Sequence, residues 1–493
     1  MTSLNRLRPL VLLSIVSVVF LIIYYSVNTE PVYPLQTVTK EDITESIEQL
    51  SKQFDLNTDI KSKAPTYETR ANESIGQYIA KQKWTPEEIE NLTNEIPIYT
   101  ISVLVEMDHF EVDPFTAEVV RASNIFYEID SEHEVNEFIE KVFGAGFEKV
   151  NEEQNFFGEV EQIYSRGEVI GDIEEKLSVT LTDHAIIGFH KYGEVRDFQL
   201  STSLFNFWEI ILMLIFMITI VIIAIVATVQ LIKRLNKNEI ETFLGPFLIS
   251  LLAGVGWFFG LYLAMGTVDV FSLLFTGLLT YTTFIILLIT AKKADYVQPF
   301  SQIAIKLQPA VWNGFLLMLV STVLVTIFYG IWAQFGAWTS PVMDYSIFLN
   351  TPIWALPVFA LSLGICASIS EETIFRRYLI PAFDRWGVIF SVIATSFLWG
   401  IGHMGYHMVP WHIRIFEFMI IVGPFFYFVY KRYGFVTAIF CHYFYNSLFG
   451  SIFLISIYWP VGILSFVLTL VPFFVFLKRS GENRGHLLFR SVS

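Results

Sequence analysis

Two adjacent carboxylates, Glu371 and Glu372, lie in an otherwise apolar part of the sequence, directly after the uncharged run "PVFALSLGICAS" and Ile369–Ser370. Carboxylates inside an apolar membrane segment are costly, and they mark candidate functional sites. Glu372 and Arg376 are four residues apart, so on a helix they share a face and are expected to pair. Glu371 is rotated about 100° from that face and is expected to stay free for chemistry.

Two imidazoles and an amide, His403, His442 and Asn446, follow within the same apolar part of the chain. A carboxylate beside imidazoles can take a proton from water, and an imidazole or amide can stabilise the resulting oxyanion. Alternatively, Glu371, His403 and His442 are candidate ligands of zinc or another divalent metal that activates the water. Both routes lead to hydrolysis, and the residue types alone leave the metal-free and the metal-dependent mechanism open.

The spacing of these residues predicts that they meet. The helix that carries Glu371 is expected to continue to the turn "DRWG" at 384–387, and the next helix to climb back to His403. Both residues then lie roughly 20–25 Å from this turn, at matching height on antiparallel helices. His442 and Asn446 are four residues apart on a third helix, so both are expected to face one cavity, at a somewhat lower level.

Other polar residues nearby suit the chemistry less well. His403 and His407 have the i, i+4 spacing of a zinc pair on a helix, but no Glu follows His403 as the zincin motif requires. Glycines and Pro410 also interrupt the helical pattern there. His407 and His412 therefore remain weaker alternatives, and Glu417 is expected to be a structural partner near the outer face.

The composition places these residues in a membrane protein. Of the 493 residues, 54% are hydrophobic and only 16% are charged, well below the usual quarter of a soluble protein. The net charge of -15 comes from one segment, because residues 28–203 hold 36 acidic and 14 basic side chains, whereas the rest hold 11 and 18. No basic patch suited to nucleic acid is visible, so the expected partners are membrane lipid and a membrane-associated protein or peptide substrate.

The elements that position the polar set are predicted to be about ten membrane helices. Residues 9–27 are apolar, follow Arg6 and Arg8, and lack a small-residue cleavage site, which indicates an uncleaved signal anchor. Lys and Arg gather in alternate loops, so the positive-inside rule predicts cytoplasmic N and C termini. The other spans are expected near 206–232, 244–265, 269–291, 311–333, 351–373, 388–407, 413–430, 435–454 and 457–477.

Between the first two spans, the sequence predicts an extracytoplasmic α+β domain. Residues 98–129 alternate apolar and polar side chains around an Asp-Pro turn, which is typical of paired strands. "SEHEVNEFIEKVF" has a helical period and stops at Gly144. A helix followed by a hairpin occurs twice, and this arrangement loosely resembles PepSY-like modules. Both cysteines, Cys366 and Cys441, lie in apolar runs, which excludes a disulfide framework in this domain.

Three short motifs resemble those of the CPBP family of intramembrane proteases, also called the Abi or type II CAAX prenyl protease-like family. "EETIFRR" matches its EExxxR motif, and "HYFYN" matches HxxxN through His442 and Asn446. "WGIGHM" resembles FxxxH, with Trp399 in place of the usual Phe and His403 in register. The motifs occur in the family's order within about residues 350–456. Because Trp399 stands at a position expected to pack rather than react, this departure is expected to matter little.

The resemblance implies a metallo- or glutamate-type intramembrane endopeptidase. It implies that Glu371 activates water with His403, that His442 and Asn446 stabilise the oxyanion, and that Glu372 and Arg376 support the first motif. The alternative is a non-catalytic membrane scaffold or bacteriocin-immunity protein on the same fold. Under either function, we expect a multi-pass protein of the bacterial plasma membrane. The expected domains are 1–28 (anchor), 29–203 (extracytoplasmic), 204–345 (accessory helices), 346–478 (protease core) and 479–493 (tail).

Overall fold

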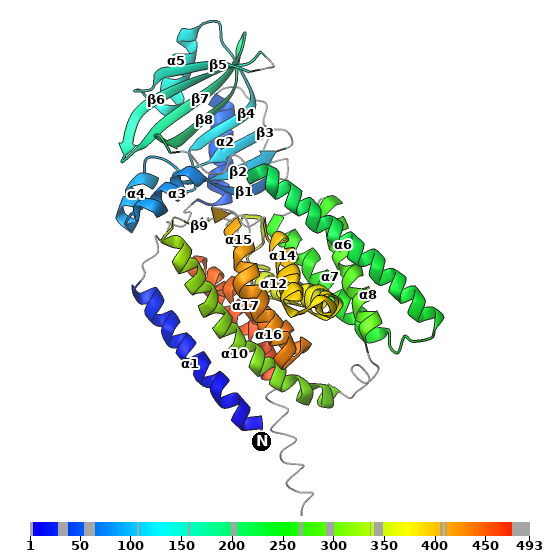
Figure 1. Cartoon of the computed structure of the whole chain (residues 1–493). Coiled ribbons are helices and arrows are strands. Elements are labelled where there is room, and N and C mark those ends of the chain that lie inside the picture. Colours follow the sequence, from blue (N-terminus) through cyan, green and yellow to red (C-terminus); the bar gives the residue numbers. More distant parts are fainter. Residues whose placement is uncertain are drawn as a thin grey trace, which may run out of the picture.

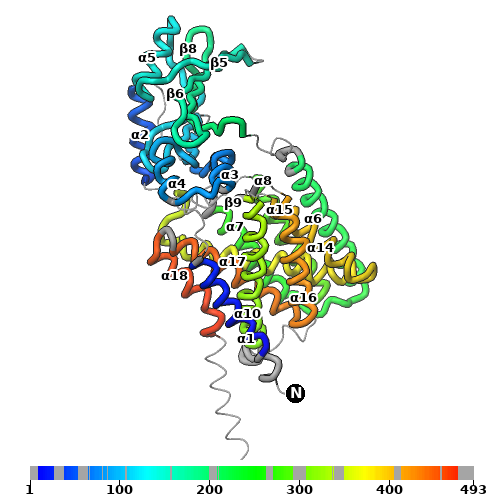
Figure 2. The backbone as a smooth tube through the Cα atoms, turned by 60° about the vertical axis from the view of Figure 1, so that its left-hand side comes forward, coloured from blue at the N-terminus to red at the C-terminus, as the bar shows by residue number. Residues whose placement is uncertain are grey.

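The computed structural model of the chain has a sheet domain stacked on a bundle of apolar helices (Figure 1). A tube view from another side shows the same stacking, with α1 (Ser3–Val27) beside α10 (Phe300–Ala333) (Figure 2). The structure describes residues 3–27, 38–53, 65–105, 108–155, 158–198, 205–265, 270–291, 300–335, 337–339, 349–404, 408–409 and 412–475.

The sheet domain contains one eight-stranded antiparallel sheet in the order β1-β2-β3-β4-β8-β7-β6-β5. The order follows from two four-stranded halves, β1 to β4 and β5 to β8, whose last strands pair with each other. The strands are β1 (Thr66–Ala71), β2 (Tyr99–Val105), β3 (Asp108–Val112), β4 (Val119–Glu128), β5 (Glu148–Gln154), β6 (Val160–Ile170), β7 (Ile173–Thr182) and β8 (Ala185–Val195).

The predicted Asp-Pro turn is present between β3 and β4. The carboxylate of Asp113 accepts hydrogen bonds from the backbone N–H groups of Phe115 at 2.7 Å and Thr116 at 3.1 Å, which closes the turn. The predicted helix that stops at Gly144 is also present, and this glycine has a φ of 81°, a conformation that favours glycine. The local signals of this domain were therefore sufficient to predict its hairpin and this helix.

Helices pack on the sheet through alternate strand residues. Ile47 of α2 and Phe138 of α5 share one core with Ile101 of β2 and Phe189 of β8. The helices of this domain are α2 (Lys40–Gln53), α3 (Glu73–Gln82), α4 (Pro86–Thr93) and α5 (Glu132–Phe143). α3 and α4 form a second core with Ile173 of β7 and Val195 of β8. The resemblance to PepSY-like modules stays a prediction.

In the described part of the chain, eight helices are long and apolar enough to cross a membrane. Two further apolar helices, Val388–Ile401 and Trp459–Val475, are shorter, and with them the count matches the ten predicted spans. The remaining elements of this part are α6 (Phe205–Asn236), α7 (Leu244–Met265), α8 (Val270–Thr290), α12 (Leu356–Glu371), α13 (Ile380–Phe383), α14 (Val388–Ile401), α15 (His412–Phe416), α16 (Gly423–Tyr433), α17 (Phe435–Ile457) and α18 (Trp459–Thr469).

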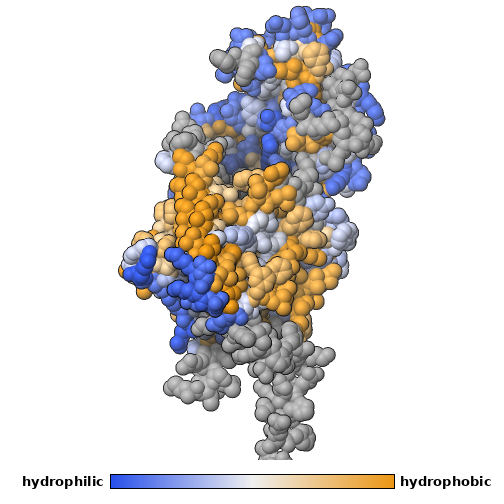
Figure 3. All heavy atoms as spheres, turned by 90° about the vertical axis from the view of Figure 1, so that its right-hand side faces the viewer, coloured by the Kyte–Doolittle hydropathy of each residue, from blue (hydrophilic) through white to orange (hydrophobic). Residues whose placement is uncertain are grey.

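The polytopic helical fold with an added α+β domain is therefore confirmed. Figure 3 shows a wide apolar surface over the helices, with hydrophilic side chains on the sheet domain above it and on the opposite end below it. Lys233 and Arg234, in the last turn of α6, belong to this opposite end. Which end faces the cytoplasm stays a prediction from the loop charges.

The helix that carries Glu371 continues to the turn at 384–387, as expected. The span was placed at 351–373, and the helical run begins at Leu356 and ends at Trp386, with a π-helix at Glu372–Leu379 and a short 3-10 turn at Asp384–Trp386. The helix expected at 388–407 ends at Ile401, because Gly402 and the turn after it do not continue it. Hydrophobic composition alone could not locate this end.

Close packing of α12 against α17 sets the geometry of the site. At Gly364 of α12, an added Cβ would lie 1.8 Å from the hydroxyl of Ser447 and 2.9 Å from the carbonyl oxygen of Tyr443, both on α17. Only a glycine fits there, and small residues of this kind allow membrane helices to approach closely. The helix that carries Glu371 is thus held directly against the helix that carries His442.

The segment before α12 ties the helices to the sheet domain. Leu349 is buried in the core formed by α2, α5 and the sheet. The side-chain amide of Asn350 donates a hydrogen bond of 2.9 Å to the carbonyl oxygen of Tyr67 in β1. A two-stranded ladder, β9 (Trp338–Thr339) with β10 (Met408–Val409), joins two loops at the same end of the bundle. The N-terminal end of α12 therefore lies beside the sheet domain.

Candidate active site

Three helical segments bring the predicted residues together. Glu371 is the last residue of α12, His403 lies in the turn just after α14, and His442 lies on α17. Oε2 of Glu371 is 3.8 Å from Nε2 of His403 and 4.0 Å from Nε2 of His442. The expected matching height of Glu371 and His403 is thus correct, although His403 stands in a turn and not within a helix.

A π-helix follows Glu371 immediately. Its wide turns use i→i+5 hydrogen bonds, such as that from the N–H of Ile380 to the carbonyl oxygen of Phe375. Pro381 comes next, and because proline has no N–H it cannot continue the regular α-helical ladder. Such π segments are frequent at functional sites. Here the π-helix contains both Glu372 and Arg376.

The predicted Glu372–Arg376 pair is formed. Nε of Arg376 lies 3.3 Å from Oε2 of Glu372, and both side chains are almost fully buried, at 2% and 0% exposure. The other carboxylate oxygen, Oε1, lies 3.0 Å from Nδ1 of His442. Glu372 therefore bridges the first motif to the third. Helical spacing could not predict this second contact, because the two residues belong to different helices.

Trp399 packs in the core, as expected, with 2% of it exposed. Glu371, however, was expected to be free. Instead, the indole N–H of Trp399 donates a hydrogen bond to Oε2 of Glu371. A buried tryptophan N–H usually finds an acceptor, so the Trp in place of Phe was itself a signal of this contact. The substitution adds a donor at the carboxylate that is proposed to do the chemistry.

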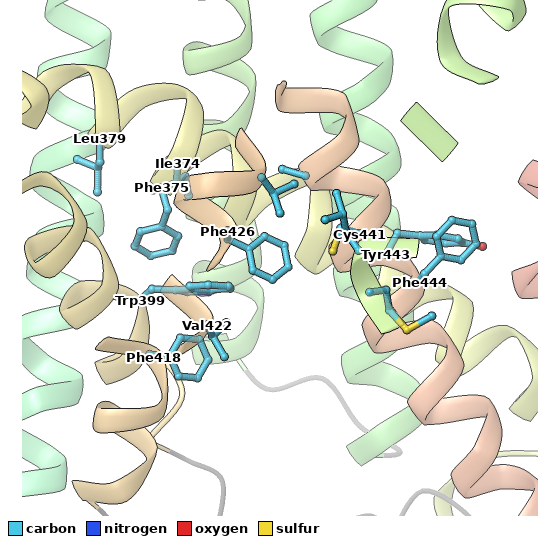
Figure 4. Close-up of a cluster of buried hydrophobic side chains, with 14 of the residues drawn as sticks. Ile374, Phe375, Leu379, Trp399, Phe418, Val422, Phe426, Cys441, Tyr443 and Phe444 are labelled. Atoms are coloured by element: carbon cyan, nitrogen blue, oxygen red, sulfur yellow. The ribbon is translucent and has the colours of Figure 1, made fainter. Parts of the chain in front are cut away.

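The ring of Trp399 packs against Arg376 and two phenylalanines. The guanidinium carbon of Arg376 lies 3.6 Å from the centroid of this ring, a close cation–π contact. Phe418 and Phe426 pack edge-on against it, with ring centroids 4.7 Å and 5.5 Å away. Figure 4 shows these aromatic side chains converging from different helices, together with Phe375. The apolar shell thus holds the indole, and with it the carboxylate of Glu371, in one position.

The backbone of Trp399 orients His403. Its carbonyl oxygen lies 2.9 Å from Nδ1 of His403. A carbonyl only accepts hydrogen bonds, so Nδ1 carries the proton in this contact. In the neutral imidazole, Nε2 is then the basic nitrogen, and it is the atom that faces Glu371. The ring of Phe418 lies against the imidazole at a centroid distance of 4.4 Å and limits its rotation.

A cavity of about 420 Å³ lies against these groups. Its polar lining includes all four predicted catalytic residues, and Asn446 is one turn above His442 on α17. Most of the remaining wall is aromatic or aliphatic. The cavity is lined by Trp257, Ser321, Phe359, Leu363, Ala367, Glu371, Trp399, His403, Arg414, Glu417, Phe418, Val422, Phe426, His442, Tyr445, Asn446, Phe449, Gly450 and Phe453.

Glu417 lines the same cavity, which the sequence did not predict. As expected, it is a structural partner, because Nη1 of Arg414 lies 2.6 Å from its Oε2 and the hydroxyl of Tyr329 donates to the same oxygen. However, both Arg414 and Glu417 are part of the cavity wall. His412 lies on α15 with its ring near Phe416. His407 lies outside the residues that the structure describes.

A metal site needs several donor side chains arranged around one point. Among the described residues, no three His, Cys, Asp or Glu side chains are placed to hold a metal ion together. Glu371, His403 and His442 come nearest by donor type, but Oε2 of Glu371 already accepts from Trp399. As placed, these residues do not form a metal site.

A comparison with protein families finds a match over the residues that contain the three motifs. The model of the type II CAAX prenyl endopeptidase Rce1-like family matches residues 352–448. These residues belong to that family. The expected CPBP/CAAX protease relationship is therefore confirmed. The family consists of intramembrane proteases, and the matched segment contains every residue of the three motifs. The sheet domain and α1 to α10 lie outside the match.

Neither the curated proteins nor the solved structures contain a match to the chain. Together with its eight span-length helices, the Rce1-like segment identifies an integral, multi-pass membrane protein.

Proposed function

We propose that this protein is an intramembrane endopeptidase that hydrolyses a peptide bond of a membrane-associated protein. The observation that carries the proposal is the approach of Oε2 of Glu371 to Nε2 of both His403 and His442, at 3.8 and 4.0 Å, on the wall of a cavity within the helices. Separations of this size leave room for a water molecule held between hydrogen-bonding partners.

In the proposed mechanism, Glu371 and His403 activate that water. Glu371 takes a proton from the water as its oxygen attacks the carbonyl carbon of the scissile bond. Nε2 of His403 accepts a hydrogen bond from the water and directs it. The same proton then passes from Glu371 to the leaving amine nitrogen as the carbon–nitrogen bond breaks. The second proton of the water stays on the oxygen bound to the acyl carbon, so the products are a new carboxylic acid and a new amine, and the atoms of one water molecule are accounted for.

His442 and Asn446 are proposed to stabilise the oxyanion. Nδ1 of His442 is held by Glu372, so Nε2 is the ring nitrogen that is left toward Glu371 and the cavity. In the proposed step, Nε2–H of His442 donates a hydrogen bond to the oxyanion. The amide of Asn446 lines the cavity one turn away and supplies a second donor. Donors fixed in advance at the developing charge are the largest single contribution in many enzymes.

The central test is Glu371→Gln, which keeps the shape of the side chain and removes the base. We expect cleavage of a membrane-embedded reporter to fall at least 100-fold, as is typical for loss of a general base, and His403→Ala to have a similar effect. Comparative membrane proteomics should show uncleaved substrates accumulating in the Glu371→Gln strain. The control is Glu239→Gln, at an exposed position after α6, which should behave as the parent.

The second candidate function is a non-catalytic scaffold or immunity protein. If Glu371→Gln and His403→Ala both cleave at the parental rate, the assigned roles are wrong. If the biological phenotype survives both substitutions while the protein accumulates normally, the scaffold function replaces the protease. The intact set of carboxylate, imidazoles and amide favours the protease, because a scaffold does not need a water-activating carboxylate beside two imidazoles.

A divalent metal remains the alternative mechanism proposed from the sequence. Glu371, His403 and His442 would be its ligands, after a rearrangement that releases Glu371 from Trp399. The purified protein should be assayed after dialysis against a chelator and after return of Zn²⁺, with metal content measured in parallel. Loss and recovery of activity that follow metal content would favour the metal route, and activity that is independent of metal content would favour the glutamate route.

A further inference from the structure

The cavity occupies only one half of the helix that carries Glu371. On α12, its lining side chains begin at Phe359, near the start of the helix at Leu356, and end at Glu371. The helical run then continues to Trp386 without contributing another lining residue. At 1.5 Å per residue, the cavity reaches about 22 Å from the Leu356 end. The end at Trp386 is separated from it by buried side chains.

Two further helices also line the cavity along only part of their length. On α17, which runs antiparallel to α12, the lining residues extend from His442 to Phe453, so they leave out the first turns of this helix and continue to near its C-terminal end. In the run that starts at His412 and includes α16, they extend from Arg414 to Phe426 and so lie in its first part. The chain direction alternates between these helices. All three sets therefore lie toward the same end of the bundle.

That end carries the sheet domain. Leu349 and Asn350, just before α12, contact the core and β1 of the domain. The basic side chains Lys431 and Arg432 lie at the opposite end, in the last turn of α16. Phe449, on the cavity wall, is 39% exposed, so part of this wall reaches the surface of the helical part. By the loop charges, this half faces away from the cytoplasm.

We propose that the substrate enters from the membrane face that carries the sheet domain, as an extended apolar segment of a membrane-anchored protein, and is cut on that side of the bilayer. The inference rests on the proposed protease function for the cleavage step. The proposed side of entry defines the substrate class. The substrates are proteins whose scissile segment can be reached from the non-cytoplasmic face. A cytoplasmic C-terminal peptide would have to cross the buried half of α12 to reach Glu371.

The wall indicates the chemistry of the entering segment. Between Glu371 and the open end, the cavity presents Phe359 and Leu363 of α12 and Phe449 and Phe453 of α17. Aromatic and aliphatic walls favour apolar side chains. The lining of α12 from Phe359 to Glu371 covers about 18 Å of helix, and an extended chain rises about 3.3 Å per residue, so this length holds roughly five residues. The chain must be extended there, because helical hydrogen bonds would keep the scissile carbonyl occupied.

The direction of entry can be measured without any substrate. Phe449→Cys and Phe453→Cys are made in the full-length protein and treated with a small, charged, membrane-impermeant thiol reagent in sealed vesicles of known orientation. The native cysteines, Cys366 and Cys441, are buried and set the background. Reference positions are Phe126→Cys on the sheet domain and Lys233→Cys at the opposite end of α6. Phe126 is 61% exposed, and Lys233 is also exposed.

We expect Phe449→Cys and Phe453→Cys to react in the same vesicles as Phe126→Cys, and Lys233→Cys to react only in vesicles of the other orientation or after permeabilisation. Val436→Cys, near the other end of α17, is the matched control on the same helix and should not follow Phe126→Cys. Reaction of the two cavity cysteines together with Lys233→Cys, or reaction from neither side, would overturn the proposal.

A second measurement follows the products. For each protein that accumulates in the Glu371→Gln strain, the fragment released by the parent is located by fractionation. We expect the fragment on the non-cytoplasmic side, and cytoplasmic fragments would refute the proposed direction. If no protein accumulates and no fragment appears, the protease function fails. The labelling result then still decides the orientation of the cavity, so the two failures are distinguishable.

Discussion

At the residue scale, the feature that distinguishes this site is the hydrogen bond from Trp399 to Glu371. The carboxylate is held by an indole N–H on one oxygen, which aims the group toward the imidazoles. The same residue supplies the carbonyl that fixes the tautomer of His403 and the ring that contacts Arg376. One side chain thus positions members of two motifs. A phenylalanine at this position could pack in the same way but could not donate.

We therefore predict that Trp399→Phe lowers kcat ten- to hundredfold and changes KM little. The substitution removes a hydrogen bond to a charged group, worth about 1.5–3 kcal/mol, and keeps an aromatic ring against Arg376. Steady-state cleavage of a membrane-embedded reporter provides the measurement. Trp312→Phe, which removes an indole N–H from a ring packed on Phe473, is the matched control. An unchanged kcat in Trp399→Phe would mean that the contact does not support catalysis.

At the scale of the elements, the contact between α12 and α17 controls the distance between the first and third motifs. Gly364 leaves no room for a Cβ beside Ser447 and Tyr443, so the two helices meet at backbone contact. Glu372 and His442, which lie farther along these helices, are joined by the 3.0 Å contact. The packing at one glycine is thus linked to the geometry of the catalytic groups.

The prediction at this scale is that Gly364→Ala destabilises the protein and reduces cleavage. Overpacking a tight contact costs about 1–3 kcal/mol, and separation of the helices would lengthen the Glu372–His442 contact. Gly277→Ala in α8 is the matched control, because an added Cβ there meets nothing within 4 Å. It should be neutral or stabilising by up to about 1 kcal/mol. Thermal unfolding in detergent, followed by the reporter assay, compares the two, and equal behaviour would refute the prediction.

At the scale of the whole molecule, two parts with different chemistry are joined at the end of the bundle where α12 begins. The helical part depends on apolar burial, whereas the sheet domain carries a polar row across β2, β3, β4 and β8. In this row, Glu111 lies 3.1 Å from Nη1 of Arg121 and accepts a hydrogen bond from Thr100. His190 pairs with Arg121 across the strands. Burial lowers the pKa of His190 to about 4, against the partial opposing effect of Glu111.

The sheet domain is accordingly expected to lose stability on acidification. A histidine with a lowered pKa in the folded state binds fewer protons than in the unfolded state between about pH 6.5 and 4, so the free energy of unfolding falls as the pH falls through that window. Calorimetry at about pH 7 and pH 4.5 should show a lower Tm for the domain at the acid pH. His190→Gln should reduce this pH dependence, whereas His133→Gln, on the exposed face of α5, should not.

By itself, the sequence determined the membrane helices, the Glu372–Arg376 pair, the turn after β3 and the three motifs that place residues 352–448 in the Rce1-like family. Each depends on residues close together in the chain, where composition, helical spacing and turn chemistry act directly. Only the tertiary structure decided that Trp399 donates to Glu371 and that Glu372 holds His442, contacts between residues 28 and 70 positions apart. It also decided the direction of the cavity, because spacing fixes height along a helix but not which faces of separate helices meet.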